Sequence, residues 1–433
     1  MKFPISSGVR RVGRPDAHGR VPRSGGAQVQ GCPGAGASSR VGQTGDMRAY
    51  LDHAATTPMR PEAVEAMLPY LSGTEMFGNA SGSHRESRRA RLAVDDAREK
   101  IADLLGADLG EVVFTGSGTE ADNLAITGAL RARASSHDGR SGVIVCSAME
   151  HHAVLNTCRA AVEQGGIELR EVQTDRSGIV DLASFAEACT SEVRLVSVMA
   201  VNNEIGTVQP LDEVSRLVRA QAPGAVLHTD AVQAAAWLDM APITAAVDLL
   251  ALSAHKFGGP KGVGLLVVRN GVPIDAVTHG GGQERERRSG THNVAGIVAM
   301  AAALSATVDQ RSDTAARVTA LRDRLVDGLL ALVEGAEETG DRSRKVPGHA
   351  HLCFTGIESE AMMVLLDEAG VAASAGAACS SGAVDASHVL LSMGLDSAVA
   401  GSGVRFSLGT TSTDVEVDHV LAVVPGVVAR LRN

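Results

Sequence analysis

Short apolar runs alternate with helical patterns along most of this chain, and this alternation restricts the possible folds more than any other feature. Strands are predicted at Val112–Phe114, Val143–Cys146, Leu195–Val201, Val226–Gln233, Val247–Leu252 and Val263–Val268. Helices are predicted at Pro61–Tyr70, His84–Leu105, Ala121–Arg133, Val154–Gln164 and Leu211–Ala220. Strands separated by helices are typical of β-α-β units and a largely parallel sheet. We therefore predict an α/β fold that binds its ligands at the carboxyl ends of the strands.

The composition argues against several classes of protein. The chain has 433 residues, 44% of them hydrophobic, which is enough for two domains or for one large domain with an elaboration. Its 40 basic and 50 acidic residues give a net charge of −10, which argues against direct binding of nucleic acid. No apolar run reaches the roughly 18 residues of a membrane span. The six cysteines form no CxxC motif, which favours a reducing, cytoplasmic location over a zinc site or disulfide framework.

The first 46 residues differ in character from the rest of the chain. They contain ten glycines and seven Lys or Arg against two Asp, without apolar periodicity. Such a segment buries too little apolar surface to offset its ordering entropy, so we predict that it is disordered. It lacks the apolar region of a secretory signal. Met47 directly precedes the first patterned sequence, and we expect it to be the natural start, with residues 1–46 an over-extended reading frame.

One lysine stands at the end of an apolar strand. The run Val247–Leu252 leads into Ser253-Ala254-His255-Lys256, and a Gly-Gly-Pro turn follows. Burial lowers the pKa of a lysine, and the neutral amine is the form that condenses with a carbonyl group. The alternative is an ordinary turn lysine whose amine extends into solvent.

Other polar groups follow the remaining strands. Gly118 and Thr119 lie between a strand and a helix, where free backbone N–H groups and the helix dipole favour an anion. The turn lacks both the lysine of a phosphate-binding loop and the third glycine of a dinucleotide fingerprint. His151 could lie flat against a ring or be part of a surface histidine pair. An acid such as Asp230 can hold a pyridinium nitrogen, so together with a lysine these groups fit a pyridoxal-phosphate site.

From about Ala49 to Ala429 the chain resembles the class V aminotransferases, and within them the IscS/NifS-type cysteine desulfurases. The matching blocks are Tyr50–Pro58, Phe77–Ser81, Thr119–Ala125, Glu150–Leu155, Val201–Gly206, Ser253–Lys256, His279–Arg285, Arg288–Thr291, Cys379 and Arg405–Gly409. The resemblance implies the pyridoxal-phosphate transferase fold (fold type I), in which a large domain with a mostly parallel sheet carries a smaller α+β domain. We expect the large domain at residues 63–307 and the smaller one at 47–62 and 308–433.

The same resemblance implies roles for individual residues. Lys256 would hold pyridoxal 5'-phosphate as an internal aldimine and move the Cα proton of the substrate, and His151 would stack on the ring and exchange protons. Arg405, with Asn203, would bind the substrate carboxylate, and Thr291 would reach the phosphate of a neighbouring subunit, which implies a homodimer with shared sites. The remaining cofactor-binding residues implied are Gly118, Thr119, Asn203, Asp230, Gln233, Ser253 and His255.

Cys379 decides between functions within this fold. It lies in a run of small residues, Ser374–Gly382, and a thiolate on such a loop can attack the sulfur of a bound cysteine. The resemblance implies a cysteine desulfurase that converts L-cysteine to L-alanine. The persulfide would pass to an iron–sulfur scaffold or a tRNA-thiolating enzyme, and transient ligation of a cluster by Cys379 stays open. No other metal site is expected. The alternatives are a selenocysteine lyase or aminotransferase of the same fold, and a non-catalytic scaffold.

Overall fold

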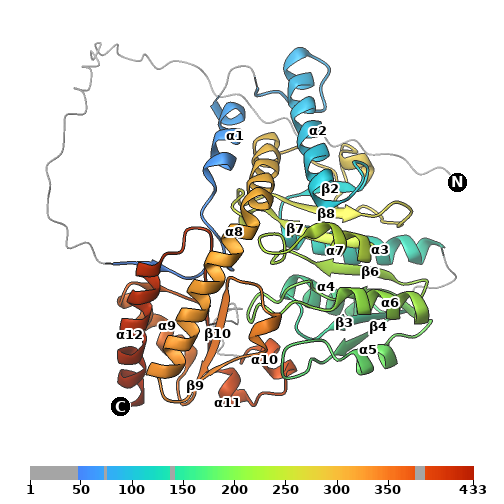
Figure 1. Ribbon diagram of the computed structural model, residues 1–433. Coiled ribbons are helices and arrows are strands. Elements are labelled where there is room, and N and C mark those ends of the chain that lie inside the picture. Colours follow the sequence, from blue (N-terminus) through green and yellow to red (C-terminus); the bar gives the residue numbers. More distant parts are fainter. Residues whose placement is uncertain (1–46, 73–75, 137–141, 376–385) are drawn as a thin grey trace, which may run out of the picture. The chain divides into compact units, whose positions relative to one another are not determined.

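The computed structural model describes residues 47–72, 76–136, 142–375 and 386–433 (Figure 1). The side chains of residues 134–136 are not included in this description. The predicted leader, residues 1–46, and Cys379 both lie outside the described residues. The described residues all belong to one unit, residues 46–433.

A seven-stranded sheet forms the centre of this unit, with the strand order β2-β8-β7-β6-β5-β3-β4. Its strands are β2 (Val112–Thr115), β3 (Gly142–Ser147), β4 (Ile167–Val172), β5 (Val193–Ser197), β6 (Val226–Asp230), β7 (Leu249–Ser253) and β8 (Gly264–Val268). All neighbouring strands are parallel except at β8, which is antiparallel to β2 and to β7. The predicted, mostly parallel α/β sheet is therefore confirmed.

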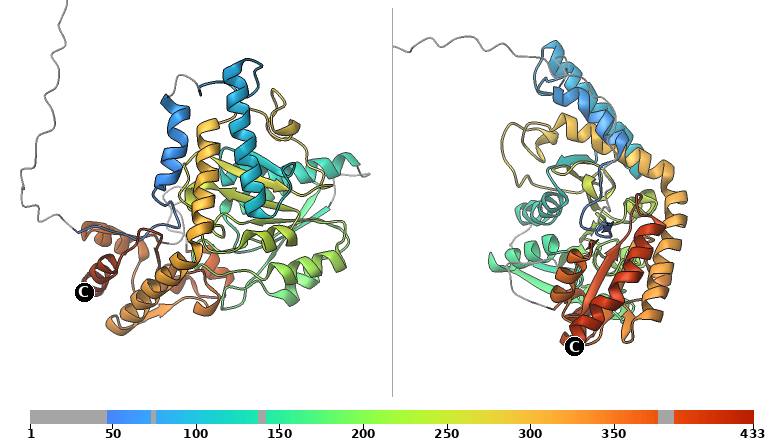
Figure 2. Two further views of the ribbon diagram at one scale, coloured as in Figure 1. Left: turned by 45° about the horizontal axis from the view of Figure 1, so that its top comes forward. Right: turned by 90° about the vertical axis from the view of Figure 1, so that its left-hand side faces the viewer.

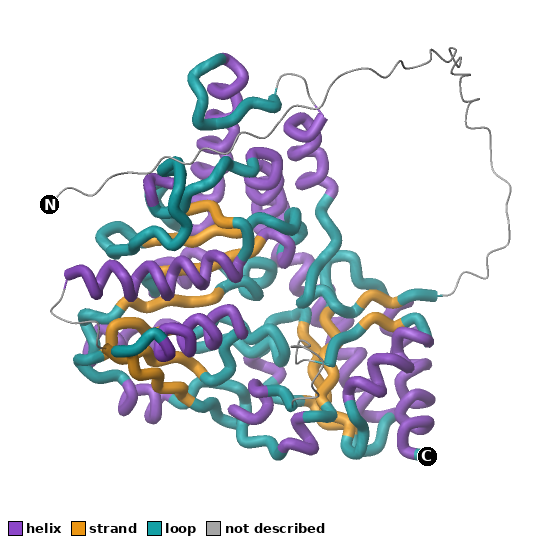
Figure 3. The backbone as a smooth tube through the Cα atoms, turned by 180° about the vertical axis from the view of Figure 1, so that it is seen from behind, coloured by secondary structure: helices purple, strands orange, loops and turns teal. Residues whose placement is uncertain are grey.

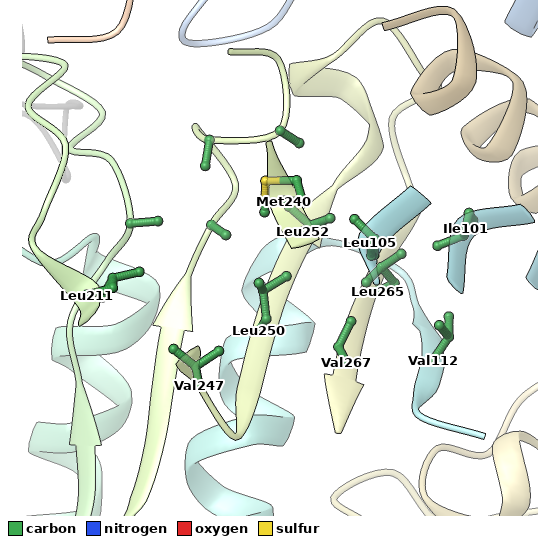
Figure 4. Packing of buried hydrophobic residues seen from close by; sticks show 14 of the residues in the cluster. Ile101, Leu105, Val112, Leu211, Met240, Val247, Leu250, Leu252, Leu265 and Val267 are labelled. Carbon is green, nitrogen blue, oxygen red and sulfur yellow. The ribbon is translucent and has the colours of Figure 1, made fainter. Parts of the chain in front are cut away.

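Helices cover both faces of the sheet because its strands are apolar on both sides. The helices up to the middle of the chain are α1 (Pro61–Ser72), α2 (Arg85–Leu105), α3 (Gly118–Ser136), α4 (His152–Glu163), α5 (Leu182–Ala188), α6 (Leu211–Gln221) and α7 (Met240–Ala246). Leu250 and Leu252 of β7 pack with α2, α6 and α7, as Figure 4 shows in part, whereas Leu249 and Ala251 pack with α3 and α4. Successive strand residues point to opposite faces, so a continuous apolar run serves both layers.

A second group of strands and helices lies beside this sheet (Figures 2 and 3). It has its own apolar core. Its strands are β1 (Ala49–Tyr50), β9 (Ala336–Glu338), β10 (His349–Phe354), β11 (Val371–Ala372) and β12 (Gly403–Ser407). They form an antiparallel sheet, β12-β10-β9, and a parallel pair, β1-β11. The helices of this group are α9 (Ser359–Glu368), α10 (His388–Ser392), α11 (Ser397–Ala400) and α12 (Asp414–Arg432).

One long helix, α8 (Val294–Leu332), belongs to both cores. Residues of its first half, such as Leu304, pack with the large sheet, whereas Leu325 and Leu329 pack with the second core. Helices α1 and α2 lie beside its first half (Figure 2). The predicted boundary at residues 307/308 falls inside this continuous helix, and the proposed domain limits stay a prediction.

Four predicted boundaries differ from the structure by three or four residues, among them the end of α3, which lies at Ser136 rather than Arg133. Helix α3 begins at Gly118 rather than Ala121, because the Ser117 hydroxyl accepts a hydrogen bond from the Glu120 N–H (3.1 Å) and so caps the helix early. Strands β5 and β6 end at Ser197 and Asp230, before the predicted ends at 201 and 233. Beyond those points the chain leaves the sheet in turns that carry polar residues. No helix among the described residues is long and apolar enough to cross a membrane.

Candidate active site

A pocket of about 380 Å³ lies beyond the carboxyl ends of β6 and β7 and the first residues of α3 and α4. Its size falls within the range of small-molecule sites. The predicted site residues that line it are Gly118, Thr119, His151, Asn203, Asp230, Gln233, Ser253, His255, Lys256 and Arg405. The structure therefore gathers at one place residues that are up to 287 positions apart, since Gly118 and Arg405 both line the pocket.

Lys256 ends the short helical turn η1 (Ala254–Lys256) that directly follows β7. Its Nζ donates hydrogen bonds to the carbonyl oxygens of Ala54 (2.5 Å) and Ala55 (2.9 Å). Burial and the nearby Arg405 guanidinium lower the pKa of Lys256 to about 8, although Asp230 and Asp52 act in the opposite direction. About a tenth of this amine is therefore neutral at pH 7, far more than for an ordinary lysine, and the neutral form is the one that carbonyl condensation requires.

The N-terminus of α3 supplies an anion cradle. Ser117 accepts hydrogen bonds from the N–H groups of Glu120 and Ala121, while those of Gly118 and Thr119 have no acceptor in the described part of the chain. A Cβ at Gly118 would lie 2.8 Å from Val232 Cγ2 and 3.2 Å from Ser253 Cβ, so a larger residue would displace the side chains beside the cradle. The residues that lie beside it are Ser253 and His255.

An imidazole and a carboxylate lie in the same pocket on different elements. His151 caps α4, and its Nδ1 accepts a hydrogen bond from the Ala153 N–H (3.1 Å), which places the ring proton on Nε2. Burial lowers the pKa of His151. Asp230 ends β6, and burial raises its pKa, although His151, the Val232 N–H and Lys256 counteract that effect. The pocket therefore holds a proton acceptor, His151, together with a carboxyl group whose charge burial disfavours and a cationic partner would stabilise.

Arg405 on β12 extends its guanidinium into the pocket from the second core. Its Nη2 donates to Asp52 Oδ1 (2.7 Å) and its Nη1 to the Asn203 carbonyl oxygen (2.8 Å). Its Nε has no hydrogen-bond partner among the described residues. Gln233 donates through Nε2 to the Ala54 carbonyl oxygen (2.8 Å), the same atom that accepts from Lys256.

Two acidic residues of the site are absent from our sequence prediction. Asp52 pairs with Arg405, and Asp122 lines the pocket with its Oδ1 3.4 Å from His228 Nε2. Burial and the charges of Asp230 and Glu150 raise the pKa of Asp122 well above its ordinary value. Both residues lie within the sequence blocks that carry the resemblance, so the signal was present but did not indicate their contacts.

Two predicted residues do not line the described pocket. Cys379 lies outside the described residues. On one side of that segment, Ser374 lines the pocket and its backbone pairs with that of Arg405 (2.8 and 3.1 Å). On the other side, the Ser387 hydroxyl donates to Glu204 Oε2. Thr291 is described and exposed, and it is not among the residues that line this pocket.

Fold and pocket together define an α/β enzyme with a lysine at a strand end, facing an anion cradle. A model of the family Aminotransferase class-V matches residues 49–420, and the chain belongs to this family. Within it, the predicted resemblance to IscS/NifS-type cysteine desulfurases is confirmed. An "IscS-like cysteine desulfurase" of Mycobacterium tuberculosis is 45% identical, with 89% of this chain and 97% of the relative aligned.

Other relatives agree with this placement. A "Cysteine desulfurase IscS" of Methanosarcina thermophila is 41% identical over 89% of this chain and 93% of its own length. A solved "NIFS-LIKE PROTEIN" superposes with a TM-score of 0.81 at 34% identity, covering 89% of this chain and all of its own. "SspA in complex with cysteine" superposes with a TM-score of 0.73 at 30% identity, covering 84% of this chain and 100% of its own.

Proposed function

We propose that this protein is a pyridoxal-phosphate-dependent cysteine desulfurase that converts L-cysteine to L-alanine and holds the released sulfur as a persulfide on Cys379. The observation that carries the proposal is the pocket that combines Lys256 of lowered pKa with the open cradle at Gly118 and with Arg405. The relatives named cysteine desulfurase, at 41–45% identity over 89% of the chain, support the same activity.

The residues present fit pyridoxal phosphate. The free N–H groups at Gly118 and Thr119, with Ser253 and His255, suit the phosphate, and Asp230 suits the pyridinium nitrogen. His151 would stack on the ring, and Gln233 and Asn203 would face its hydroxyl side. Once bound through Lys256, the cofactor withdraws electrons from the substrate and so weakens the bonds at Cα and Cβ.

Different side chains of the protein would bind the substrate, transfer protons and accept the sulfur. Arg405 binds the substrate carboxylate, a bidentate task suited to a guanidinium. The neutral amine of Lys256 removes the Cα proton, and His151 exchanges protons near the substrate sulfur. The Cys379 thiolate attacks that sulfur, and the Cβ–S bond breaks with its electron pair going to carbon. The carbon takes up a proton to become the methyl group of alanine, and Cys379 keeps the sulfur as a persulfide.

Further properties belong to the same proposal. A homodimer would bring Thr291 of one chain to the phosphate in the other, and the exposure of Thr291 is compatible with that use. The persulfide would supply iron–sulfur cluster assembly or tRNA thiolation in the cytoplasm, and a transient cluster at Cys379 would be part of that transfer.

The test is the release of alanine and sulfide from L-cysteine in the presence of a thiol reductant, comparing wild type with Cys379→Ala. Equal amounts of both products from the wild type and none from the variant support the proposal. Unchanged activity in the variant would favour a selenocysteine lyase or an aminotransferase, because neither needs this thiol. Absence of both products and of a bound yellow cofactor in the wild type would favour a non-catalytic scaffold.

A further inference from the structure

A second, smaller cavity adjoins the cofactor pocket at Lys256. The two share the walls Ala54, Gln233 and Lys256. The smaller cavity measures about 40 Å³, against about 380 Å³ for the cofactor pocket. A single water molecule needs about 10–15 Å³ on the same measure. The smaller cavity therefore has room for a few waters or one small ion, and not for a metabolite.

The charged side chains that line this cavity are all cationic: Arg60, Arg311 and Lys256. Burial lowers the pKa of His53 to about 4 and that of His349 well below its ordinary value, so neither imidazole adds charge at neutral pH. Among the described residues that line it, none is an aspartate or a glutamate. Arg60 donates through Nη1 to Gln310 Oε1 (2.9 Å). Neither arginine has a carboxylate within 4 Å in the described ranges of the chain.

One donor in the cavity clearly lacks an acceptor: the Nε of Arg311 is buried without a hydrogen-bond partner among the described residues. His349 is 1% exposed, and burial lowers its pKa well below the ordinary value, so its ring carries a single N–H donor. Burial lowers the pKa of Arg60 and of Arg311, and the carboxylates that offset this, Glu62 and Asp239, do not line the cavity. A buried donor without an acceptor is costly, and so is a partly desolvated cation without a nearby carboxylate; a ligand with acceptor oxygens reduces both costs.

We propose that this cavity binds one small inorganic oxyanion of the phosphate or sulfate class. Two guanidinium groups, with the hydroxyls of Thr314 and Thr410 also in the lining, offer directional donors that suit tetrahedral oxygens better than a halide. The walls come from α8, from the segment after β1 and from the residues after β12. The bound anion would thus link both apolar cores at the middle of α8 and stabilise their association.

The direct test is isothermal titration of inorganic phosphate into the protein saturated with pyridoxal phosphate, so that the cofactor's own phosphate position is filled. We expect saturable binding with one site per chain in the wild type. The same titrant should give no saturable heat with Arg311→Gln or Arg60→Gln. Arg324→Gln serves as the matched control, because Arg324 is on the same helix but pairs with Asp414 and Asp418 at the surface, and it should bind like the wild type.

A second readout is thermal unfolding of the same holoenzyme at constant ionic strength. At a phosphate concentration ten times the dissociation constant, the ratio of folded to unfolded protein should rise about elevenfold in the wild type and not in Arg311→Gln. Equal stabilisation of both would reflect general salt effects and would overturn the site. Saturation by chloride but not by phosphate or sulfate would overturn the oxyanion class. If the arginine variants fail to fold, absence of phosphate binding to the wild type alone would refute the proposal, and neither readout depends on desulfurase activity.

Discussion

Two arginine–carboxylate pairs with buried guanidinium groups differ in how completely their hydrogen bonds are satisfied. Arg98 contacts Glu284 through both terminal nitrogens (2.8 and 2.7 Å), and Glu284 also accepts from the Phe114 N–H and pairs with His292 Nε2. Arg405 reaches Asp52 through one nitrogen only, and its Nε lacks a partner among the described residues.

This difference in hydrogen bonding indicates that Arg98–Glu284 is a structural pair, whereas Arg405 can still bind a ligand. Every oxygen of Glu284 is occupied, and the carboxylate anchors the unusual turn Glu284–Glu286, whose three residues all have positive φ (50°, 56° and 65°). Such a turn persists only where the surrounding contacts hold it. Arg405 keeps an unused donor inside the pocket, so a substrate carboxylate can bind there.

The largest expected effect is on stability, in Glu284→Gln. Burial raises the pKa of Glu284, but the hydrogen bonds from Arg98 and His292 overcome this and hold it at about 2. The amide would leave Arg98 as an unpaired buried cation, which costs about 3–5 kcal/mol. Urea unfolding should show this loss, whereas KM for L-cysteine in the folded protein should not change. Glu286→Gln, in the same turn but exposed, is the control and should be neutral; equal losses in both would refute the distinction.

The next effect concerns Lys256, a half-buried cation that contacts only carbonyl oxygens among the hydrogen bonds of the described residues. Its pKa of about 8 in the folded protein is below the ordinary 10.5. Between these values the unfolded chain binds more protons, so the stability of cofactor-free protein should rise with pH from about 8 to 10.5, by up to about 3 kcal/mol. Lys256→Met should remove this rise in urea unfolding at pH 7 and pH 10.5, and Lys261→Met, exposed in the adjacent turn, should retain it.

The residues at strand ends could be predicted from the sequence, whereas the arginine–carboxylate pairs could not. Lys256, Gly118 and Asp230 follow strand ends, and a parallel sheet brings such positions together whatever the loops between them. The partners of the arginines could not be predicted, because Arg98 and Glu284 are 186 residues apart and Arg405 and Asp52 are 353 apart. Periodicity indicates which residues share one element, but not which elements pack against each other. The early start of α3 was visible in principle, as a Ser-x-x-Glu cap at Ser117.

A third prediction concerns Arg405→Gln. Loss of a charge-assisted pair with the substrate carboxylate costs about 1.5–3 kcal/mol, so kcat/KM for L-cysteine should fall about 10- to 100-fold, mainly through KM. Stability should change less than in Glu284→Gln, because the Asp52 side chain is 24% exposed and can be hydrated. Steady-state kinetics and urea unfolding measure the two effects. Arg405→Lys keeps the positive charge but loses the two parallel N–H donors of the guanidinium. Its KM for L-cysteine should lie between those of the wild type and Arg405→Gln. An unchanged KM in Arg405→Gln would place the carboxylate elsewhere.

The smallest effect is expected from Asp52→Asn. Asp52 accepts a hydrogen bond from one terminal nitrogen of Arg405, so a substrate carboxylate would compete with it for the guanidinium. The amide keeps an acceptor oxygen but removes the charge, which should weaken that competition and lower KM for L-cysteine by about two- to fivefold, the size of a single partly exposed ion pair. The same change would also lower the pKa of Lys256 further, because the charge of Asp52 raises it. A lower KM, with a shift of the pH profile to lower pH, would mean that Asp52 competes with the substrate carboxylate for Arg405. A higher KM would mean that Asp52 orients the guanidinium, in which case the Arg405 pair would be structural in the same sense as Arg98 with Glu284.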